Sequence, residues 1–301
     1  MQKIVIICGP TAVGKTRIVI ELAKRFGGEI VSADSQQVWR GFDVGTAKPA
    51  ASEREAVPHH LIDVADPTER FDAAQFVVLA DRAIEGIAAR GRVPFVVGGT
   101  GMYIRMLVGG LCDAPPRDDE LRAELEAEIA GGGLAALHSR LAEVDPESAS
   151  RISPNDPTRI VRALEIHALT GERPSELRAG HNFSDKRYDA LKVGLAMDRG
   201  ELYRRIEGRV DRMIEAGLED EARRLIESCG AASQPLIAVG YREMASYLAG
   251  EIDLPEAIRL IKQSTRRFAK RQMTWFRADP EIRWIPHDDL EGLVRAVAAF
   301  I

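Results

Sequence analysis

The feature that most constrains the fold lies at the start of the chain, where three segments follow one another without a break. Residues 3–8 are predicted to form a strand, since residues 4–8 are apolar and rich in β-branched side chains. Residues 9–16 read GPTAVGKT, and residues 16–26 place apolar side chains at helical spacing. The octapeptide fits the phosphate-binding pattern G-x-x-x-x-G-K-[ST], which requires a buried strand before it and a helix after it. The order of strand, glycine-rich loop and helix therefore predicts a P-loop.

The predicted loop carries the groups that hold phosphate. We expect the backbone N–H groups of residues 11–16 to point into one concavity, where a helix N-terminus adds positive charge. Lys15 brings a full charge to the distal phosphate, and the Thr16 hydroxyl is placed to ligate Mg²⁺. The usual ligand is a nucleoside triphosphate such as ATP, and the alternative is a glycine turn with an incidental lysine. The predicted phosphate-binding residues are Gly9, Thr11, Ala12, Val13, Gly14, Lys15 and Thr16.

Further strands predict a parallel sheet. Residues 29–33, 93–97 and 191–195 are short, mainly apolar segments, and residues 71–90 have helical periodicity between two of them. Strands joined by helices indicate an α/β core, with ligands at the carboxyl ends of the strands. The polar or glycine-rich turns at 9–16, 34–37 and 98–103 are therefore expected to converge on one cleft.

The middle of the chain has a different character. Residues 118–130, 134–143 and 156–170 have helical patterns, and residues 171–187 are polar and loop-like. We expect residues 1–113 and 188–301 to form the P-loop core, with long helices at 199–228 and 255–277. Residues 114–187 are expected to form an all-helical insertion domain.

Composition limits the partners and the compartment. The formal net charge of the 301-residue chain is −5, so any polyanion must bind to a local basic patch. The three cysteines form no CxxC pair, which favours a reducing cytoplasm over a disulfide framework. We find no signal peptide and no apolar run of membrane-spanning length, and we expect a monomer.

Two of the predicted turns offer chemistry to a ligand. Asp34 ends a buried strand, where it is a general base, a Mg²⁺ ligand or a helix N-cap. Ser35 and Gln37 beside it have donors and acceptors suited to the edge of a nucleobase. The second turn, GGTGMY at 98–103, allows close backbone approach and supplies the Thr100 hydroxyl. The alternative for Thr100 is a helix cap.

A basic segment lies near the C-terminus. Residues 262–277 contain six basic side chains and no acidic one, and Ile261, Phe268 and Trp275 recur every seven residues. We expect these three to face the core, which leaves a cationic exposed side suited to a polyphosphate backbone. The alternative is a solvated basic face balanced by nearby acidic residues. The cations expected on that side include Arg266, Arg267, Lys270 and Arg271.

The sequence leaves more than one role open for a group of three arginines and for a pair of histidines. Arg205, Arg209 and Arg212 either form a cationic row in the cleft or pair with acidic neighbours on the surface. His59 and His60 have no further ligand at matching spacing, so loop packing is favoured over a metal site.

Motifs along nearly the whole chain resemble the tRNA dimethylallyltransferase family, also called tRNA isopentenyltransferases. They are GPTAVGKT at 9–16, DSQQVW at 34–39, GTAKP at 45–49, PHHLID at 58–63, GGTGMY at 98–103, RIVRALEI at 159–166, LYRRIEGRVDRMIEAGLEDE at 202–221, AVGYRE at 238–243 and TRRFAKRQMTWFR at 265–277. Trp39 departs from the family's usual tyrosine, and we expect a bacterial-type member without the zinc-finger tail of eukaryotic members.

The resemblance implies transfer of a dimethylallyl group from dimethylallyl diphosphate to N6 of the adenosine 3′ of the anticodon (position 37) in tRNA. The P-loop would then hold a diphosphate leaving group with Mg²⁺. Lys15, Asp34, Thr100 and Arg209 would be catalytic, with Asp34 as general base. The implied tRNA contacts are Asp34, Ser35, Gln36, Gln37, Thr100, Arg122, Thr158, Arg159, Ile160, Val161 and Arg162, and the basic helix adds Arg266, Arg267, Lys270 and Arg271.

Three rival interpretations remain at this point. A P-loop small-molecule or nucleoside kinase explains the loop and Asp34, but it leaves the basic segment and the insertion without a role. A nucleotide-dependent RNA-binding switch lacks a guanine-specificity motif such as N-K-x-D. A prenyltransferase acting on free adenylate is disfavoured by the same basic segment.

Overall fold

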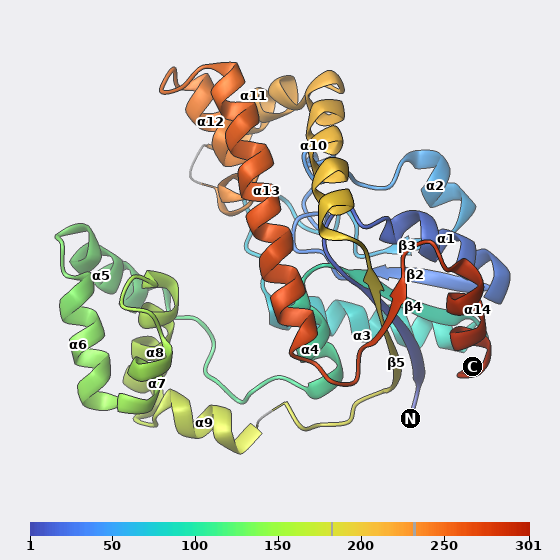
Figure 1. The fold of residues 1–301 in the computed structure, drawn as a ribbon. Helices are drawn as coiled ribbons and strands as arrows, with labels where there is room; N and C mark the ends of the chain where they lie inside the picture. Colours follow the sequence, from blue (N-terminus) through green and yellow to red (C-terminus); the bar gives the residue numbers. More distant parts are fainter. Residues whose placement is uncertain (182, 231–232) are drawn as a thin grey trace. The chain divides into compact units, whose positions relative to one another are not determined.

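The protein is described by a computed structural model over residues 1–181, 183–230 and 233–301, and it divides into two compact units (Figure 1). One unit comprises Met1–Val108 and Lys186–Ile301, and the other comprises Gly109–Asp185. The helical unit thus begins five residues before the expected insertion, at 109 rather than 114, and ends at 185 rather than 187.

The first unit is built on a six-stranded sheet, which confirms the α/β prediction. Its strands are β1 (Lys3–Cys8), β2 (Gly28–Ser32), β3 (His59–His60), β4 (Val93–Gly98), β5 (Asp189–Ala196) and β6 (Arg283–Pro286). They are all parallel, in the order β3-β2-β4-β1-β5-β6. β1 is central, with Val5 opposite Phe95 on one side and Leu191 on the other. Its apolar run without alternation is typical of a strand buried on both faces.

Helices cover the sheet and continue beyond it. They are α1 (Lys15–Phe26), α2 (Ala51–Ala56), α3 (Ala73–Ala89), α4 (Gly101–Gly109), α10 (Arg199–Glu215), α11 (Leu218–Cys229), a 3-10 turn η1 (Gln234–Ile237), α12 (Tyr241–Leu248), α13 (Leu254–Arg277) and α14 (Leu290–Ala298). One core cluster joins α1 and α14 to the sheet through residues such as Ile18, Leu22 and Val297. α10 to α13 are gathered beside one another (Figure 1).

Glycines end and begin these helices. α1 stops where Gly27 adopts the left-handed conformation, at φ 61°. The single helix predicted over 199–228 is wrong, because Gly217 is also left-handed, at φ 91°, and separates α10 from α11. A residue with a side chain would be strained at that φ, so glycine permits the break.

The second unit contains five helices among its described residues: α5 (Asp119–Ala130), α6 (Leu134–Val144), α7 (Pro146–Arg151), α8 (Pro157–Thr170) and α9 (Pro174–His181). They enclose a separate apolar core that includes Leu125, Leu141 and Ile160. Residues 171–187 were predicted to be loop-like, but α9 lies there. Proline at its first position is preorganised for a helix, although the segment itself is polar.

None of the helices in the described part of the chain combines the length and the apolar run that a membrane crossing requires.

Candidate active site

The P-loop forms a nest of open backbone amides at the carboxyl end of β1. Gly9, Ala12 and Gly14 all have positive φ, at 146°, 66° and 99°, and this turns successive N–H groups toward one side. Among the described residues, the amides of Ala12, Gly14, Lys15 and Thr16 have no hydrogen-bond acceptor. Unpaired amides at a helix N-terminus are suited to an anion, as the motif predicts.

The first amide of the predicted cradle has a different partner. Thr11 N–H donates to the side-chain Oε1 of Gln272, at 2.8 Å. The Nε2 of the same side chain donates to the Gly99 carbonyl, at 3.0 Å, and Gln272 is buried. Gln272 thus ties α13 both to the P-loop and to the end of β4. Nothing in its sequence context marked it out, since an uncharged residue in a basic helix carries no chemical signal.

Two cations lie near the loop and near Asp34. Lys15 Nζ donates to the carbonyls of Gly9 and Pro10, at 3.0 and 2.9 Å. Burial lowers the pKa of Lys15 to about 8, although the nearby Asp34 carboxylate opposes that change. Burial also lowers the pKa of Arg209, and Asp34 again opposes it. One carboxylate therefore acts on both cations, so the three charged groups share one site.

Asp34 uses one carboxylate oxygen for structure and leaves the other open. Oδ1 accepts hydrogen bonds from the amides of Gln36 and Gln37, at 2.9 and 3.4 Å. Residues 35–38 form a turn, so Asp34 caps a turn and not a helix. Oδ2 accepts no hydrogen bond from any described residue. A half-buried carboxylate with one free oxygen has an atom available to accept a proton from a ligand.

The turn after β4 packs directly against Asp34. Thr100 Oγ1 accepts from the Ser35 amide at 3.0 Å, and the Thr100 amide donates to the Ala33 carbonyl at 3.2 Å. A Cβ on Gly98 would lie 2.0 Å from that same carbonyl, so only glycine allows the approach. The three predicted turns therefore do converge at one edge of the sheet.

The two glutamines after Asp34 differ in how they are satisfied. Gln37 accepts from the Ser32 hydroxyl and donates to the carbonyls of Thr46 and Ala47, at 3.2, 3.5 and 3.4 Å. The Gln36 Oε1 atom is buried and has no partner among the described residues. An unpaired buried acceptor costs free energy, so a ligand that donates to it would be stabilised.

α13 divides its cations into paired and unpaired groups. Lys262 forms an ion pair with Asp211 at 2.6 Å, and Arg266 forms one with Glu207 at 2.7 Å. In the described part of the chain, no ion pair forms at Arg267, Lys270 or Arg271, and all three side chains are exposed. The balanced-surface alternative thus holds at one end of the basic segment and fails at the other.

The predicted inward face of α13 is partly wrong. Ile261 is buried, but Phe268 and Trp275 are 36% and 39% exposed, while Ala269 and Phe276 are buried instead. A straight α-helix drifts by about 20° for each heptad, so a seven-residue repeat moves steadily away from the face that Ile261 occupies. The Trp275 ring lies against Gly101, where an added Cβ would be 2.1 Å from it.

In the helical unit, two of the arginines implied as tRNA contacts share one buried carboxylate. Arg122 donates twice to Glu165, at 2.8 Å each, and Arg162 donates to it at 2.5 Å. Burial alone would raise the pKa of Glu165, but these hydrogen bonds outweigh it and lower the pKa to about 2. Ile160 and Val161 are buried in the helical core, so their side chains pack there.

Thr158 and Arg159 lie on the surface of the same helix, α8. The Arg159 side chain is 67% exposed and pairs with Asp156 at 3.4 Å. Its neighbour Thr158 is also exposed. Of the α8 residues implied as tRNA contacts, these two therefore present the most accessible side chains.

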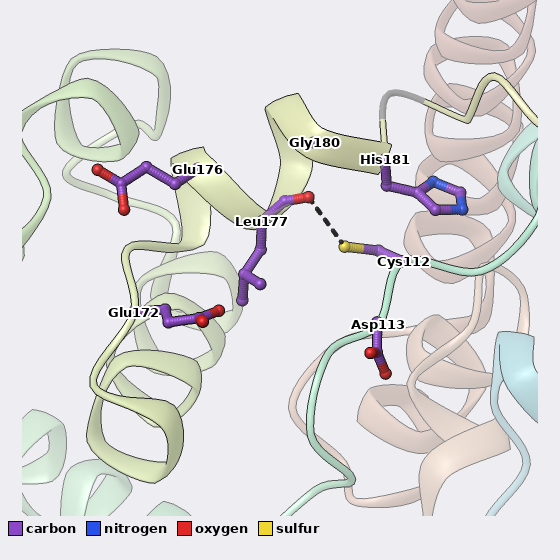
Figure 2. A pocket seen from close by; sticks show the side chains of 7 residues that line it. All are labelled: Cys112, Asp113, Glu172, Glu176, Leu177, Gly180 and His181. Atoms are coloured by element: carbon purple, nitrogen blue, oxygen red, sulfur yellow. Dashed lines mark hydrogen bonds between the residues drawn. The ribbon is translucent and has the colours of Figure 1, made fainter.

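A pocket of about 500 Å³ also belongs to the helical unit (Figure 2). Its lining includes three carboxylates, from Asp113, Glu172 and Glu176, and the Cys112 thiol. That thiol donates to the Leu177 carbonyl at 3.4 Å, as Figure 2 shows. Because the lining is acidic, this pocket does not suit a phosphate group.

The adjacent histidines His59 and His60 contact neighbouring protein groups, which favours a packing role for them over a metal site. His60 Nε2 lies 2.7 Å from a carboxylate oxygen of Glu29, and His59 Nδ1 lies 2.7 Å from the Val57 carbonyl. The described residues contain no group of three or more His, Cys, Asp or Glu side chains that could hold a metal ion.

Comparison with known proteins identifies the family of this chain. The IPP transferase family matches residues 37–279, and the isopentenyl transferase family matches residues 2–65. The chain belongs to the IPP transferase family. A tRNA dimethylallyltransferase of Anaeromyxobacter dehalogenans (strain 2CP-C) is 54% identical to it, over 98% of this chain and 99% of the relative. One from Geobacter metallireducens is 53% identical, over 95% of this chain and 93% of the relative.

Solved structures agree with this family. A tRNA isopentenylpyrophosphate transferase from Bacillus halodurans has a TM-score of 0.75 and 43% identity, over 99% of this chain and 96% of its own. A eukaryotic dimethylallyltransferase acting on tRNA has a TM-score of 0.83 and 30% identity, over 99% of this chain and 77% of its own. This IPP transferase is therefore an enzyme, and its family and the names of its relatives disfavour the kinase alternative.

Proposed function

We propose that this IPP transferase moves a dimethylallyl group from dimethylallyl diphosphate to N6 of the adenosine 3′ of the anticodon (position 37) in tRNA. The observation that carries the proposal is the open oxygen of Asp34 beside Lys15, Arg209 and the free P-loop amides. A kinase and a prenyltransferase share such a loop, but the family and the names of its relatives support prenyl transfer.

The donor's diphosphate would occupy the P-loop nest. The amides of Ala12, Gly14, Lys15 and Thr16 are free to donate to its oxygens, and Lys15 adds a full charge. Arg209 would stabilise the charge that grows on the diphosphate as it leaves. These groups are in place before the reaction, so their reorganisation costs little.

The residues present also fit Mg²⁺. The Thr16 hydroxyl has no hydrogen-bond partner among the described residues, and no protein cage of three acidic or imidazole groups is present there. Mg²⁺ in phosphate sites is held by one or two protein ligands together with substrate oxygens and water. When bound, it supplies positive charge to the leaving diphosphate.

Asp34 would act as the general base. The adenine N6 lone pair is delocalised into the ring, so N6 must lose a proton as its bond to the prenyl carbon forms. The proton goes to Asp34 Oδ2, the N6–C1 bond forms, and the C1–O bond to diphosphate breaks with both electrons leaving on oxygen. General-base assistance of this kind contributes about 10²–10⁴-fold.

The segment after Asp34 would recognise the base. The unpaired Oε1 of Gln36 offers an acceptor to a nucleobase N–H, and Ser35 and Gln37 complete the segment. Thr100, bonded to the Ser35 amide, would lie beside the reacting centre. An adenosine in a single-stranded loop reaches such a site at lower cost than a paired base.

The tRNA backbone would meet α13. Arg267, Lys270 and Arg271 offer unpaired positive charge, and the exposed rings of Phe268 and Trp275 are suited to stacking with unpaired bases. Arg266 would contribute less because Glu207 already pairs with it. In the helical unit, the proposed contacts remain Arg122 and the segment at 158–162, chiefly through Thr158, Arg159 and Arg162. We expect the enzyme to work as a monomer in the cytoplasm.

Incubation with labelled dimethylallyl diphosphate, Mg²⁺ and unmodified tRNA carrying A-A-A in its anticodon loop tests the proposal. We expect label in tRNA and none in free AMP. Label in AMP alone would overturn the acceptor, and label in neither would refute the activity. ATP hydrolysis that rises with a small-molecule acceptor would favour the kinase alternative.

A further inference from the structure

We propose that Glu221, on α11, is a positioning residue for this transfer, which acts by holding the loop at 43–47 against Arg209 and Gln37. The inference rests on the proposed function for the roles of those two residues. None of the site predictions from the sequence included Glu221, and no cation among the described residues forms an ion pair with it.

The carboxylate of Glu221 accepts hydrogen bonds from three consecutive backbone amides. Oε2 accepts from Asp43 and Val44, at 3.0 and 2.8 Å, and Oε1 accepts from Gly45 at 3.0 Å. Oε1 also accepts from the Tyr241 hydroxyl at 2.6 Å, and Glu221 is only 3% exposed. Because a carboxylate is a strong acceptor for backbone N–H groups, these bonds fix the loop at three successive residues.

Tyr241 closes the other side of this cluster. Burial, followed by the nearby Glu221 charge, raises the pKa of Tyr241 far above its usual value, so its hydroxyl remains a donor. A Cβ on residue 45 would lie 2.5 Å from the Tyr241 ring, so the loop can pack this closely against the ring only because residue 45 is glycine. Three separate motifs, at 45–49, 202–221 and 238–243, thus meet at one carboxylate.

Two carbonyl groups of the loop at 43–47 accept hydrogen bonds from side chains of the proposed active site. The Thr46 carbonyl accepts from Arg209 Nη2 at 3.1 Å and from Gln37 Nε2 at 3.5 Å. The Ala47 carbonyl accepts from Gln37 as well, at 3.4 Å. Ala47 itself has φ 47°, a conformation that a residue with a Cβ adopts only when its surroundings enforce it. Glu221 supplies part of that enforcement.

The other strongly buried glutamates have a different environment. Glu29, Glu165 and Glu243 each form an ion pair with an arginine. Among the described residues, Glu221 has no ion pair, and its charge is met by the loop amides and a phenol instead. A buried charge without a cation is expensive, which argues for a role in holding the loop.

The test compares Glu221→Gln with Glu243→Gln, a second buried glutamate that does not touch the loop. Mg²⁺-pyrophosphate affinity is measured by calorimetry, with thermal stability for both variants. We expect Glu221→Gln to weaken pyrophosphate binding about tenfold and to lower kcat/KM for the donor by about 10²-fold, as misplaced positioning groups do. Glu243→Gln should bind pyrophosphate within about twofold of wild type.

The decisive comparison uses an Arg209→Ala background. If Glu221 acts through Arg209, Glu221→Gln should weaken pyrophosphate binding no further there. Wild-type affinity in Glu221→Gln, or fully additive losses, would overturn the inference. If Glu221→Gln does not fold, Tyr241→Phe removes one of the four hydrogen bonds and should show a smaller loss of the same kind. Because pyrophosphate binding needs no tRNA, the series still tests Glu221 if prenyl transfer to tRNA itself is not observed.

Discussion

The polar groups around the P-loop and the buried carboxylates of the helical unit differ in whether they have hydrogen-bond partners. At the P-loop, four amides, one oxygen of Asp34 and the Oε1 of Gln36 have no partner among the described residues. In the helical unit, Asp145 accepts three hydrogen bonds and Glu165 accepts four. Unpaired polar groups reduce stability unless a ligand satisfies them, whereas paired groups rigidify a scaffold. The polar groups at the P-loop are therefore arranged for a ligand, whereas Asp145 and Glu165 stabilise the helical unit.

The largest expected effect comes from the open carboxylate. Asp34→Asn keeps the capping oxygen but removes the proton acceptor, so we expect transfer to fall by about 10²–10⁴-fold. Single-turnover transfer to tRNA measures this, and a tRNA-binding assay serves as its control. Binding should change little, since Asn still occupies the turn. A variant that transfers at the wild-type rate would remove Asp34 from the chemistry.

A smaller but still large effect is expected from the unpaired cations of α13. Replacing Arg267, Lys270 and Arg271 by alanine should weaken tRNA binding by roughly 10–100-fold at physiological salt, because about three phosphate contacts are lost. The dependence of log K on log salt should flatten by about 2–3. Lys262→Ala with Arg266→Ala is the matched control, since Asp211 and Glu207 already pair with those residues. Equal losses in both variants would mean that ion pairing does not decide which cations bind.

In the helical unit, replacing a buried carboxylate that already has its hydrogen-bond partners should lower stability and leave the transfer rate unchanged. Asp145 is fully buried and accepts from the Ser148 and Ser175 amides and the Ser175 hydroxyl. Asp145→Asn leaves an amide N–H₂ facing donors, which should destabilise the unit by about 1–3 kcal/mol. Chemical denaturation measures the loss. Single-turnover transfer with saturating tRNA should remain close to wild type, and a fall comparable to that of Asp34→Asn would contradict the distinction between the two units.

The smallest effect concerns pH. Lys15 is charged below its pKa of about 8 and becomes neutral as the pH rises through that value. Donor affinity should therefore be constant below about pH 7.5 and fall several-fold between pH 8 and 9, because the neutral amine no longer attracts phosphate. Bound diphosphate stabilises the charged form, so the fall should shift upward in the complex. Lys15→Arg, which stays charged, should remove the pH dependence from calorimetric pyrophosphate binding.

Much of this protein follows from local patterns. The P-loop, the parallel strands and the positions of Asp34 and Thr100 at strand ends could be predicted because each depends on residue type and short-range spacing. The edge strands β3 and β6 were missed, since two and four residues carry too little periodicity. The break at Gly217 was missed because one glycine within a helical pattern is often tolerated.

The sequence by itself determined the family, the phosphate-binding loop and the residues that carry charge, because motif and order along the chain are local properties. The tertiary structure decided which of those charges are available. It paired Arg266 with Glu207 but left Arg267 exposed, and it turned Trp275 toward the surface. It also brought Gln272 to the P-loop and Glu221 to the loop at 43–47. Those contacts join residues more than 170 positions apart, and no local pattern encodes them.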